Sequence, residues 1–211
     1  RNTARRHRWQ LDATPADGWG DRFLLVGDMR RNLLSTHPGR FQDWSGQIHA
    51  HFPDVDLSRI GPHLPQAFSA SKGKGALRIW TDLNRGNVKQ VTADVFLENA
   101  RAQLGPHLQP MSFDHIAGRV SAKPLQGGFD ISTEGLRFDT PEGLHWPGGN
   151  FNISYAEEKK GQSAKGLFHG DKLDLLSLRN IALQLPLPDS MRQTILDHKV
   201  EGLVKIVHLE W

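Results

Sequence analysis

The stretch Val91-Thr92-Ala93-Asp94-Val95-Phe96-Leu97-Glu98 is the longest clean run of alternating residues in the chain. Every second residue from Val91 to Leu97 is apolar, and most of the residues between them are polar. Successive side chains of a β-strand point to opposite faces of the sheet. The run therefore predicts a strand with one apolar and one wet face.

Similar runs occur on both sides of this stretch, at Trp9–Ala13, Trp44–Phe52, Leu77–Leu83 and Phe151–Tyr155. One-sided wetting favours antiparallel strands over parallel strands joined by helices. Turn-forming residues separate the runs at the spacing of a meander: Asn84-Arg85-Gly86-Asn87, Gly127-Gly128, Pro141-Glu142-Gly143 and Pro147-Gly148-Gly149-Asn150. We expect a mainly β fold, with a curved antiparallel β-sheet that is gutter-like or sandwich-like and two or three short α-helices.

A unit of strand, short helix and proline stop is used twice. The first copy runs from Gly46–Phe52 through Asp56 to Leu64-Pro65, and the second passes through Asp174 to Leu185-Pro186-Leu187-Pro188. An Asp at the N-cap accepts hydrogen bonds from the first helical turn, and proline ends a helix because it lacks an N–H. A third helix is expected from Pro188 to Asp197, before a last strand at Gly202–Trp211.

Composition limits the classes of function. The 211 residues include no cysteine, so disulfides and thiolate metal sites are excluded. The excess of 26 basic over 23 acidic residues is small, and only the first eight residues form a basic run, so no nucleic-acid partner is expected. No apolar run approaches the ~18 residues of a membrane helix, and no signal peptide is visible. We expect residues 1–8 to be a basic tail and residues 9–211 to be a β-rich segment of a larger protein.

Three chemical hypotheses rest on scattered residues. His49 and His51, with His169 in the second repeat, are candidate metal ligands, but no carboxylate accompanies them at a suitable spacing. A pair of carboxylates for glycoside hydrolysis would have to come from Glu98, Asp114, Asp130 or Glu134. Aromatic platforms for sugars would use Trp19, Trp80 or Trp146, which lie near predicted turns or on wet faces. Solvated strand faces explain the histidines and the carboxylates as well, and tryptophans at such positions more often anchor a loop to the core, so we expect no catalytic residue, metal or cofactor.

Two short motifs carry a resemblance to a known family. The first is Trp44-x-Gly46 followed by Asp56-Leu57 and Leu64-Pro65; the second comprises Leu185-Pro186-Leu187-Pro188, Met191-Arg192, Leu196, Gly202-Leu203 and Trp211. In order and spacing the chain resembles the YhdP-type branch of the AsmA-like (AsmA/TamB/YhdP) bacterial envelope proteins. Val200 departs from the pattern, since a proline is more usual there.

The resemblance implies a non-enzymatic segment of a large periplasmic protein, anchored to the inner membrane through a region absent from this chain. Its β-groove would carry phospholipid towards the outer membrane. The implied partners are phospholipid acyl chains and neighbouring segments of the same chain, and other regions of the protein would contact the membrane. Candidate groove residues are the apolar members of the predicted strands: Leu77, Ile79, Leu83, Val91, Ala93, Val95, Leu97, Phe151, Ile153 and Tyr155.

Other readings of the same alternation stay open. An ordinary β-sandwich core would produce the same pattern of apolar residues. A structural or protein-interaction module of the envelope, or a carbohydrate-binding β-sandwich, is therefore the alternative to lipid handling.

Overall fold

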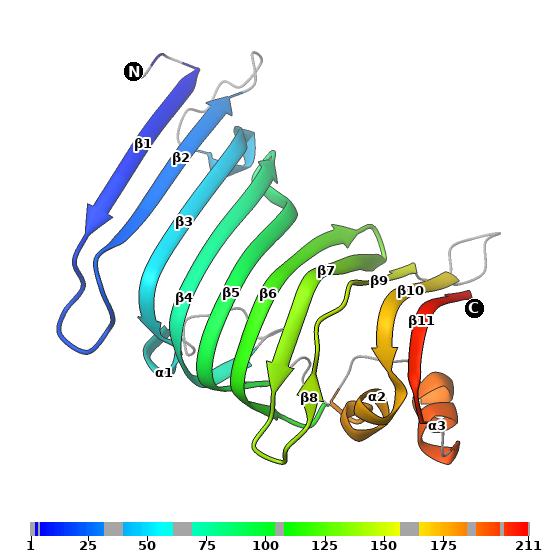
Figure 1. Ribbon diagram of the computed structural model, residues 1–211. Coiled ribbons are helices and arrows are strands. Elements are labelled where there is room, and N and C mark those ends of the chain that lie inside the picture. The colour runs from blue at the N-terminus through cyan, green and yellow to red at the C-terminus, as the bar shows by residue number, and fades with distance from the viewer. Residues whose placement is uncertain are drawn as a thin grey trace.

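The structure is a computed structural model, which describes residues 3, 5–31, 40–60, 69–103, 108–156, 165–184, 189–198 and 201–210. The described strands form one open antiparallel sheet with the order β1-β2-β3-β4-β5-β6-β7-β9-β10-β11, and β8 pairs with β7 (Figure 1). Three short helices accompany the sheet in the described part of the chain, and the predicted fold class is confirmed.

The strands are β1 (Arg6–Ala13), β2 (Phe23–Arg31), β3 (Trp44–Asp56), β4 (Ser69–Asn84), β5 (Asn87–Gln103), β6 (Met111–Leu125), β7 (Gly128–Asp139), β8 (His145–Trp146), β9 (Phe151–Ala156), β10 (Lys165–Asp174) and β11 (Leu203–Glu210). The helices are α1 (Leu57–Ile60), α2 (Leu175–Ile181) and α3 (Asp189–Asp197), and a 3-10 turn spans Phe41–Asp43.

The tight turn between β4 and β5 shows why the chain folds as a meander. Asn84 lies opposite Asn87, and the two residues between them, Arg85 and Gly86, have positive φ angles of 50° and 73°. Two successive left-handed residues make the turn whose twist suits a two-residue hairpin. The predicted turn is therefore confirmed; the register that it sets shifts by one residue between Leu83 and Asp82, and the shifted register continues along the two longest strands.

The two predicted Asp caps are present. An oxygen of Asp174 accepts a hydrogen bond from the backbone N–H of Ser177 at 2.7 Å. An oxygen of Asp56 accepts from the Ser58 N–H at 3.0 Å, so both helices begin directly after a strand. The proline stops at Pro65 and Pro186 lie outside the described residues.

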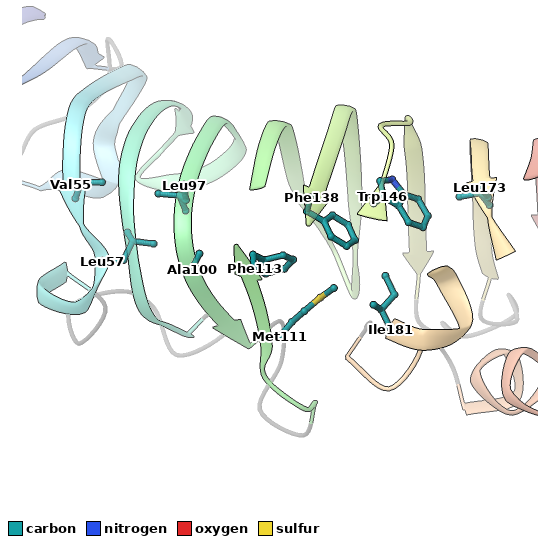
Figure 2. Packing of buried hydrophobic residues seen from close by; sticks show 10 residues of the cluster. All are labelled: Val55, Leu57, Leu97, Ala100, Met111, Phe113, Phe138, Trp146, Leu173 and Ile181. Carbon is teal, nitrogen blue, oxygen red and sulfur yellow. The ribbon is translucent and has the colours of Figure 1, made fainter. Parts of the chain in front are cut away.

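The sheet has an inner face, defined here as the face that carries the main hydrophobic cluster. Val55, Leu97, Phe113, Phe138, Trp146 and Leu173 of the strands pack there with Leu57 and with Ile181 of α2. Figure 2 shows these side chains gathered at the end of the strands where the helices lie. The helices and these side chains thus cover the inner face at this end of the strands, although the sheet is a single layer. We call these buried residues the sealed cluster.

Local breaks in the strand ladder bend the sheet. The register shifts between Phe52 and Val55 of β3 and between Ala117 and Arg119 of β6. In β5, Asn99 adopts a positive φ of 49° beside further shifts in β4. Such bulges kink a strand and increase its twist. They give the sheet the curved, gutter-like shape seen in Figure 1.

The strand β1 is held to β2 by charge. Asp28 of β2 accepts a hydrogen bond from Arg6 Nε at 2.7 Å and one from Arg8 Nε at 2.9 Å. Both arginines fall in the predicted basic tail, yet they lie in β1, which starts at Arg6. The hydrogen bonds from Arg6 and Arg8 hold the pKa of Asp28 well below its ordinary value of 3.8.

This arrangement predicts an acid-sensitive edge. A carboxylate whose pKa falls on folding contributes stability above its ordinary pKa, and this contribution is lost as the pH drops below that value. We expect amide exchange in β1 to accelerate, relative to β5, as the pH falls below 3.8. In the Asp28→Asn variant, the β1 amides should exchange fast already at neutral pH, and their protection relative to β5 should no longer depend on pH. Equal protection of the β1 amides in the parent and in Asp28→Asn at neutral pH would show that the hydrogen bonds from Arg6 and Arg8 to Asp28 do not hold β1 to β2.

Candidate functional site

Two unbroken rows of residues cross the inner face from β1 to β11. In each row, one residue per strand lies opposite its neighbours in the strand register. The first row is Trp9, Gly27, Ile48, Thr81, Val91, Ala122, Ile131, Ile153, Phe168 and Leu209. The second is Leu11, Leu25, Ala50, Ile79, Ala93, Val120, Thr133, Phe151, Gly170 and Val207. We call these the inner rows.

Neither inner row contains a charged residue, and the only polar side chains in them are the threonines Thr81 and Thr133. Thr133 is buried, and its hydroxyl accepts a hydrogen bond from the Phe151 N–H at 3.2 Å. Its polar group is thereby satisfied within the sheet. The inner rows thus make an apolar surface that crosses ten paired strands.

The structure places all ten predicted groove residues on the inner face. Ile79, Val91, Ala93, Phe151 and Ile153 belong to the inner rows, and the others flank them in adjacent rows. Leu83, Leu97 and Ile153 are buried, and the other seven are half-buried. Leu97 belongs to the sealed cluster, so it is a core residue rather than an accessible groove residue.

The opposite, outer face is mostly polar. Between the inner rows runs a row that contains His49, Trp80, Thr92, Ser121, Ser132, Asn152, His169 and His208. Beside it, Arg119 donates to Asp94 at 2.6 Å and approaches Glu134 at 3.6 Å. The hydrogen bond from Arg119 lowers the pKa of Asp94. Adjacent residues therefore lie on opposite faces: Asp94 belongs to the polar outer face and Val95 to the apolar inner face.

At the β1 end of the inner rows, the Trp9 ring covers the surface of Gly27. Gly27 has no side chain, and the indole of Trp9 lies over it: a Cβ on Gly27 would come within 2.2 Å of the Trp9 ring. An aromatic ring that covers a glycine of the neighbouring strand in this way stabilises the pairing of the two strands. On β10, the Phe168 ring lies against Gly170 of the same strand, where a Cβ would be 3.2 Å from Phe168 and from Leu173. The two rings also complete the apolar surface at both ends.

The Trp9–Gly27 contact gives a testable prediction. Gly27→Ala should push the indole off the strand, since a flexible side chain yields more easily than backbone. In a variant that keeps Trp9 as its single tryptophan, we expect the emission maximum to move to longer wavelength. Gly20→Ala and Gly148→Ala are unsuitable as controls, because backbone lies within 2.3 Å of the first and the φ of 102° at the second strains any side chain; Ser132→Thr instead adds one methyl group to β7, far from Trp9. An unshifted spectrum in Gly27→Ala would contradict the contact.

The sites of the other chemical hypotheses do not assemble. Among the described residues no group of three or more His, Asp or Glu is placed to hold a metal ion. The His49 ring packs against Trp80 at a tilt of 32°, with ring centroids 5.2 Å apart, and does not join His51 in a ligand set. The carboxylates proposed for glycoside hydrolysis lie on three strands. Two of them have other partners: Glu134 approaches Arg119, and Asp130 accepts from Asn152.

The three tryptophans considered as platforms differ from one another. Trp146 lies beside the predicted turns and packs into the core, as expected for a tryptophan that anchors a loop: it is 3% exposed and stacks on Phe138 at 5.7 Å. Trp80 does lie on the outer face, but the Arg119 guanidinium lies 5.7 Å from its ring centroid. Trp19 is 38% exposed in the loop between β1 and β2. None of these rings forms a flat platform with the others.

The fold and its inner face define a class: an open, single-layer β-gutter with an apolar interior. The family model described as YhdP protein matches residues 1–211, the whole chain, and the protein belongs to the YhdP family of cell-envelope proteins. This is not generally a family of enzymes. Searches of curated proteins and of solved structures gave no match. Among the described helices none is long and apolar enough to cross a membrane.

Proposed function

We propose that this chain is a non-enzymatic lipid-handling segment of a periplasmic protein anchored to the inner membrane. Its inner face would hold phospholipid acyl chains on their way to the outer membrane. The single observation that carries the proposal is the pair of inner rows, which cross the whole sheet without a charged side chain. Envelope membership of the family supports the location.

The energetics favour an acyl chain that stays on the inner face but can slide along it. Each methylene that leaves water gains ~0.8 kcal/mol, so a chain of about fifteen carbons gains on the order of 10 kcal/mol. Successive strands offer uncharged, mostly apolar contacts at spacings of about 4.8 Å. Sliding from strand to strand exchanges one such contact for another, whereas escape exposes the whole chain. No catalytic group, metal or cofactor is needed for this activity.

Photocrosslinking at two adjacent residues tests the proposal. Val95 and Phe96 are neighbours on β5, both apolar, and they face opposite sides of the sheet. A benzophenone amino acid at either position, in the protein produced in a Gram-negative bacterium, replaces one apolar side chain with another. We expect phospholipid on the probe at Val95 and little on the probe at Phe96. Equal lipid labelling at both positions, or none at either, would overturn the proposal.

A second candidate function is a structural or protein-interaction module. The exposed edge strand β11 favours it, since Leu203 and Ile206 are 59% and 71% exposed there. Unpaired edges with apolar side chains readily pair with other strands. With the same benzophenone amino acid placed at Ile206 of β11, this function predicts protein adducts there and no lipid at Val95.

A further inference from the structure

The positive charge of the molecule is concentrated at one rim of the sheet. This far rim, as we call it, is the end of the strands opposite the helices, and it includes the turns that join β4 to β5 and β6 to β7 (Figure 1). It comprises residues 5–8, 28–31, 40–47, 82–90, 123–130, 154–156, 165–167 and 210. These residues include ten Lys or Arg and five Asp or Glu, whereas the other described residues include twelve and sixteen. The far rim is therefore cationic, and the remainder of the described chain is acidic overall.

Some cations of the far rim have no partner in the described part of the chain. Arg85 lies in the turn between β4 and β5, Lys89 near the start of β5 and Lys123 near the end of β6. All three are exposed, and their side chains make no hydrogen bond or ion pair with the described residues. At the other end of the sheet, by contrast, Arg22 pairs with Asp12 at 2.5 Å. Neighbouring cations that lack carboxylate partners attract an anion from outside the protein.

The far rim adjoins the apolar inner rows. Lys123 directly follows Ala122 of the first inner row, and Tyr155 lies two residues beyond Ile153 of the same row. The Tyr155 ring is half-buried, and its centroid lies 6.1 Å from that of Phe129. Tyrosine suits such a boundary, because its ring is apolar and its hydroxyl is polar. A ligand placed here would meet positive charge at one end and an apolar surface at the other.

We propose that the far rim holds the phosphate group of a phospholipid whose acyl chains lie on the inner face. This inference rests on the proposed function, and it adds which way the lipid points. A phosphate carries negative charge and several acceptor oxygens, which match the N–H donors of Arg85, Lys89 and Lys123. The apolar inner rows begin next to these cations, so one lipid can meet both surfaces at once.

The length of the strands suits this orientation. From Lys89 to Leu97 of the sealed cluster, β5 spans about 27 Å at about 3.4 Å per residue. One acyl chain takes up about 15 Å, half of the ~30 Å hydrocarbon core of a bilayer. The lipid therefore fits along the strands between the far rim and the sealed cluster. The reverse orientation would bring the phosphate to the end of the sheet where carboxylates outnumber cations.

Matched lipids test the role of the phosphate. Lauroyl lysophosphatidic acid and lauroylglycerol carry the same acyl chain on the same glycerol, and only the first has a phosphate. Each would be titrated as a monomer, at low salt, into the full 211-residue chain and followed by NMR. We expect both lipids to shift the Val91 and Ala93 amides. The phosphate lipid should also shift the Lys89 and Gly127 amides and bind at least fivefold more tightly, a preference that added salt removes by screening exposed charges.

A variant of the far rim separates binding of the phosphate from binding of the acyl chain. It combines Arg85→Asn, Lys89→Gln and Lys123→Gln, where asparagine suits the positive φ of position 85. We expect this variant to bind the two lipids about equally, since the acyl-chain surface is unchanged.

The matched control removes the same charge from the other end of the sheet. It combines Lys72→Gln, Arg101→Gln and Arg137→Gln, all at exposed strand positions. We expect the control to keep the preference for the phosphate lipid. An equal loss of preference in both variants would show that net charge, and not the far rim, attracts the phosphate.

The remaining outcomes separate this inference from the proposed function. Equal binding of the two lipids by the parent, with the Val91 shift retained, would overturn the phosphate site and leave the proposed function intact. No binding of either lipid would overturn both. Glycerol 3-phosphate, which has no acyl chain, should bind at least tenfold more weakly than the lysolipid, and equal binding would contradict a lipid site. A phosphate preference seen only with phosphatidylglycerol vesicles would assign the far rim to a membrane surface and overturn the proposal.

Discussion

Phe138→Ala is expected to lower the free energy of unfolding by about 3–5 kcal/mol, the usual cost of removing a buried aromatic ring. Phe138 is 6% exposed, stacks on Trp146 at 5.7 Å and meets Phe113 edge-on at 5.4 Å. Its removal would open a cavity beneath α2, where strands and helix share a core. Urea unfolding followed by circular dichroism measures the loss.

Phe96→Ala is the matched control for this prediction. Phe96 has the same side chain, but it lies on the outer face and is 52% exposed. A surface substitution of this kind changes stability by about 0.5 kcal/mol or less. If the two variants lost equal stability, the sealed cluster would not be the main stabilising core of the sheet.

Ala122→Glu is expected to reduce lipid crosslinking at Val95 at least tenfold. Ala122 lies in an inner row between Val91 and Ile131, and a carboxylate there would have to be desolvated beneath an acyl chain. Burial of an unpaired charge costs several kcal/mol, which exceeds the contact energy of a few methylenes. Quantitative mass spectrometry of the lipid adducts measures the effect.

Ser121→Glu provides the comparison, because Ser121 is the preceding residue and faces outward, where its hydroxyl lies 3.0 Å from that of Thr92. The same charge on the outer face should leave lipid labelling within about twofold of the parent. Both variants should remain folded, since each site is half-buried and lets the carboxylate reach water. Equal labelling in Ala122→Glu and Ser121→Glu would contradict a one-sided lipid path.

Alternation in the sequence was sufficient to predict the faces of β1, β3, β4, β5 and β9. It worked because a strand in a single-layer sheet has one wet side, so polarity follows the strand period. The faces of strand β2 could not be predicted from alternation, because Leu24, Leu25 and Val26 are all apolar. In the structure, Leu24 and Val26 fall on the outer face. The lengths of β4 and β5 were underestimated, since both continue through bulges that interrupt the alternation.

The fate of single aromatic residues could not be predicted in this way. Trp146 follows a turn and has only one strand neighbour, so the local sequence favours a tryptophan that anchors a loop but does not identify its contacts. Its burial depends on Phe138 and on the cluster that includes Ile181, which lies 35 residues further along the chain. Trp9 shows the converse: its neighbour Gly27 gives no local signal, and only the register brings the two together.

The most direct test of the central claim uses two native tryptophans. Trp9 lies on the inner face and Trp80 on the outer face, and they are similarly exposed, at 40% and 37%. Two variants would each keep one of these residues as the single tryptophan, with the other five of the chain replaced by phenylalanine. Each variant would be mixed with phospholipid whose acyl chains carry bromine, which quenches indole fluorescence on contact. An acyl-chain path along the inner face predicts saturable quenching of Trp9 and little quenching of Trp80. Equal quenching of both, or quenching of Trp80 alone, would contradict an acyl-chain path along the inner face.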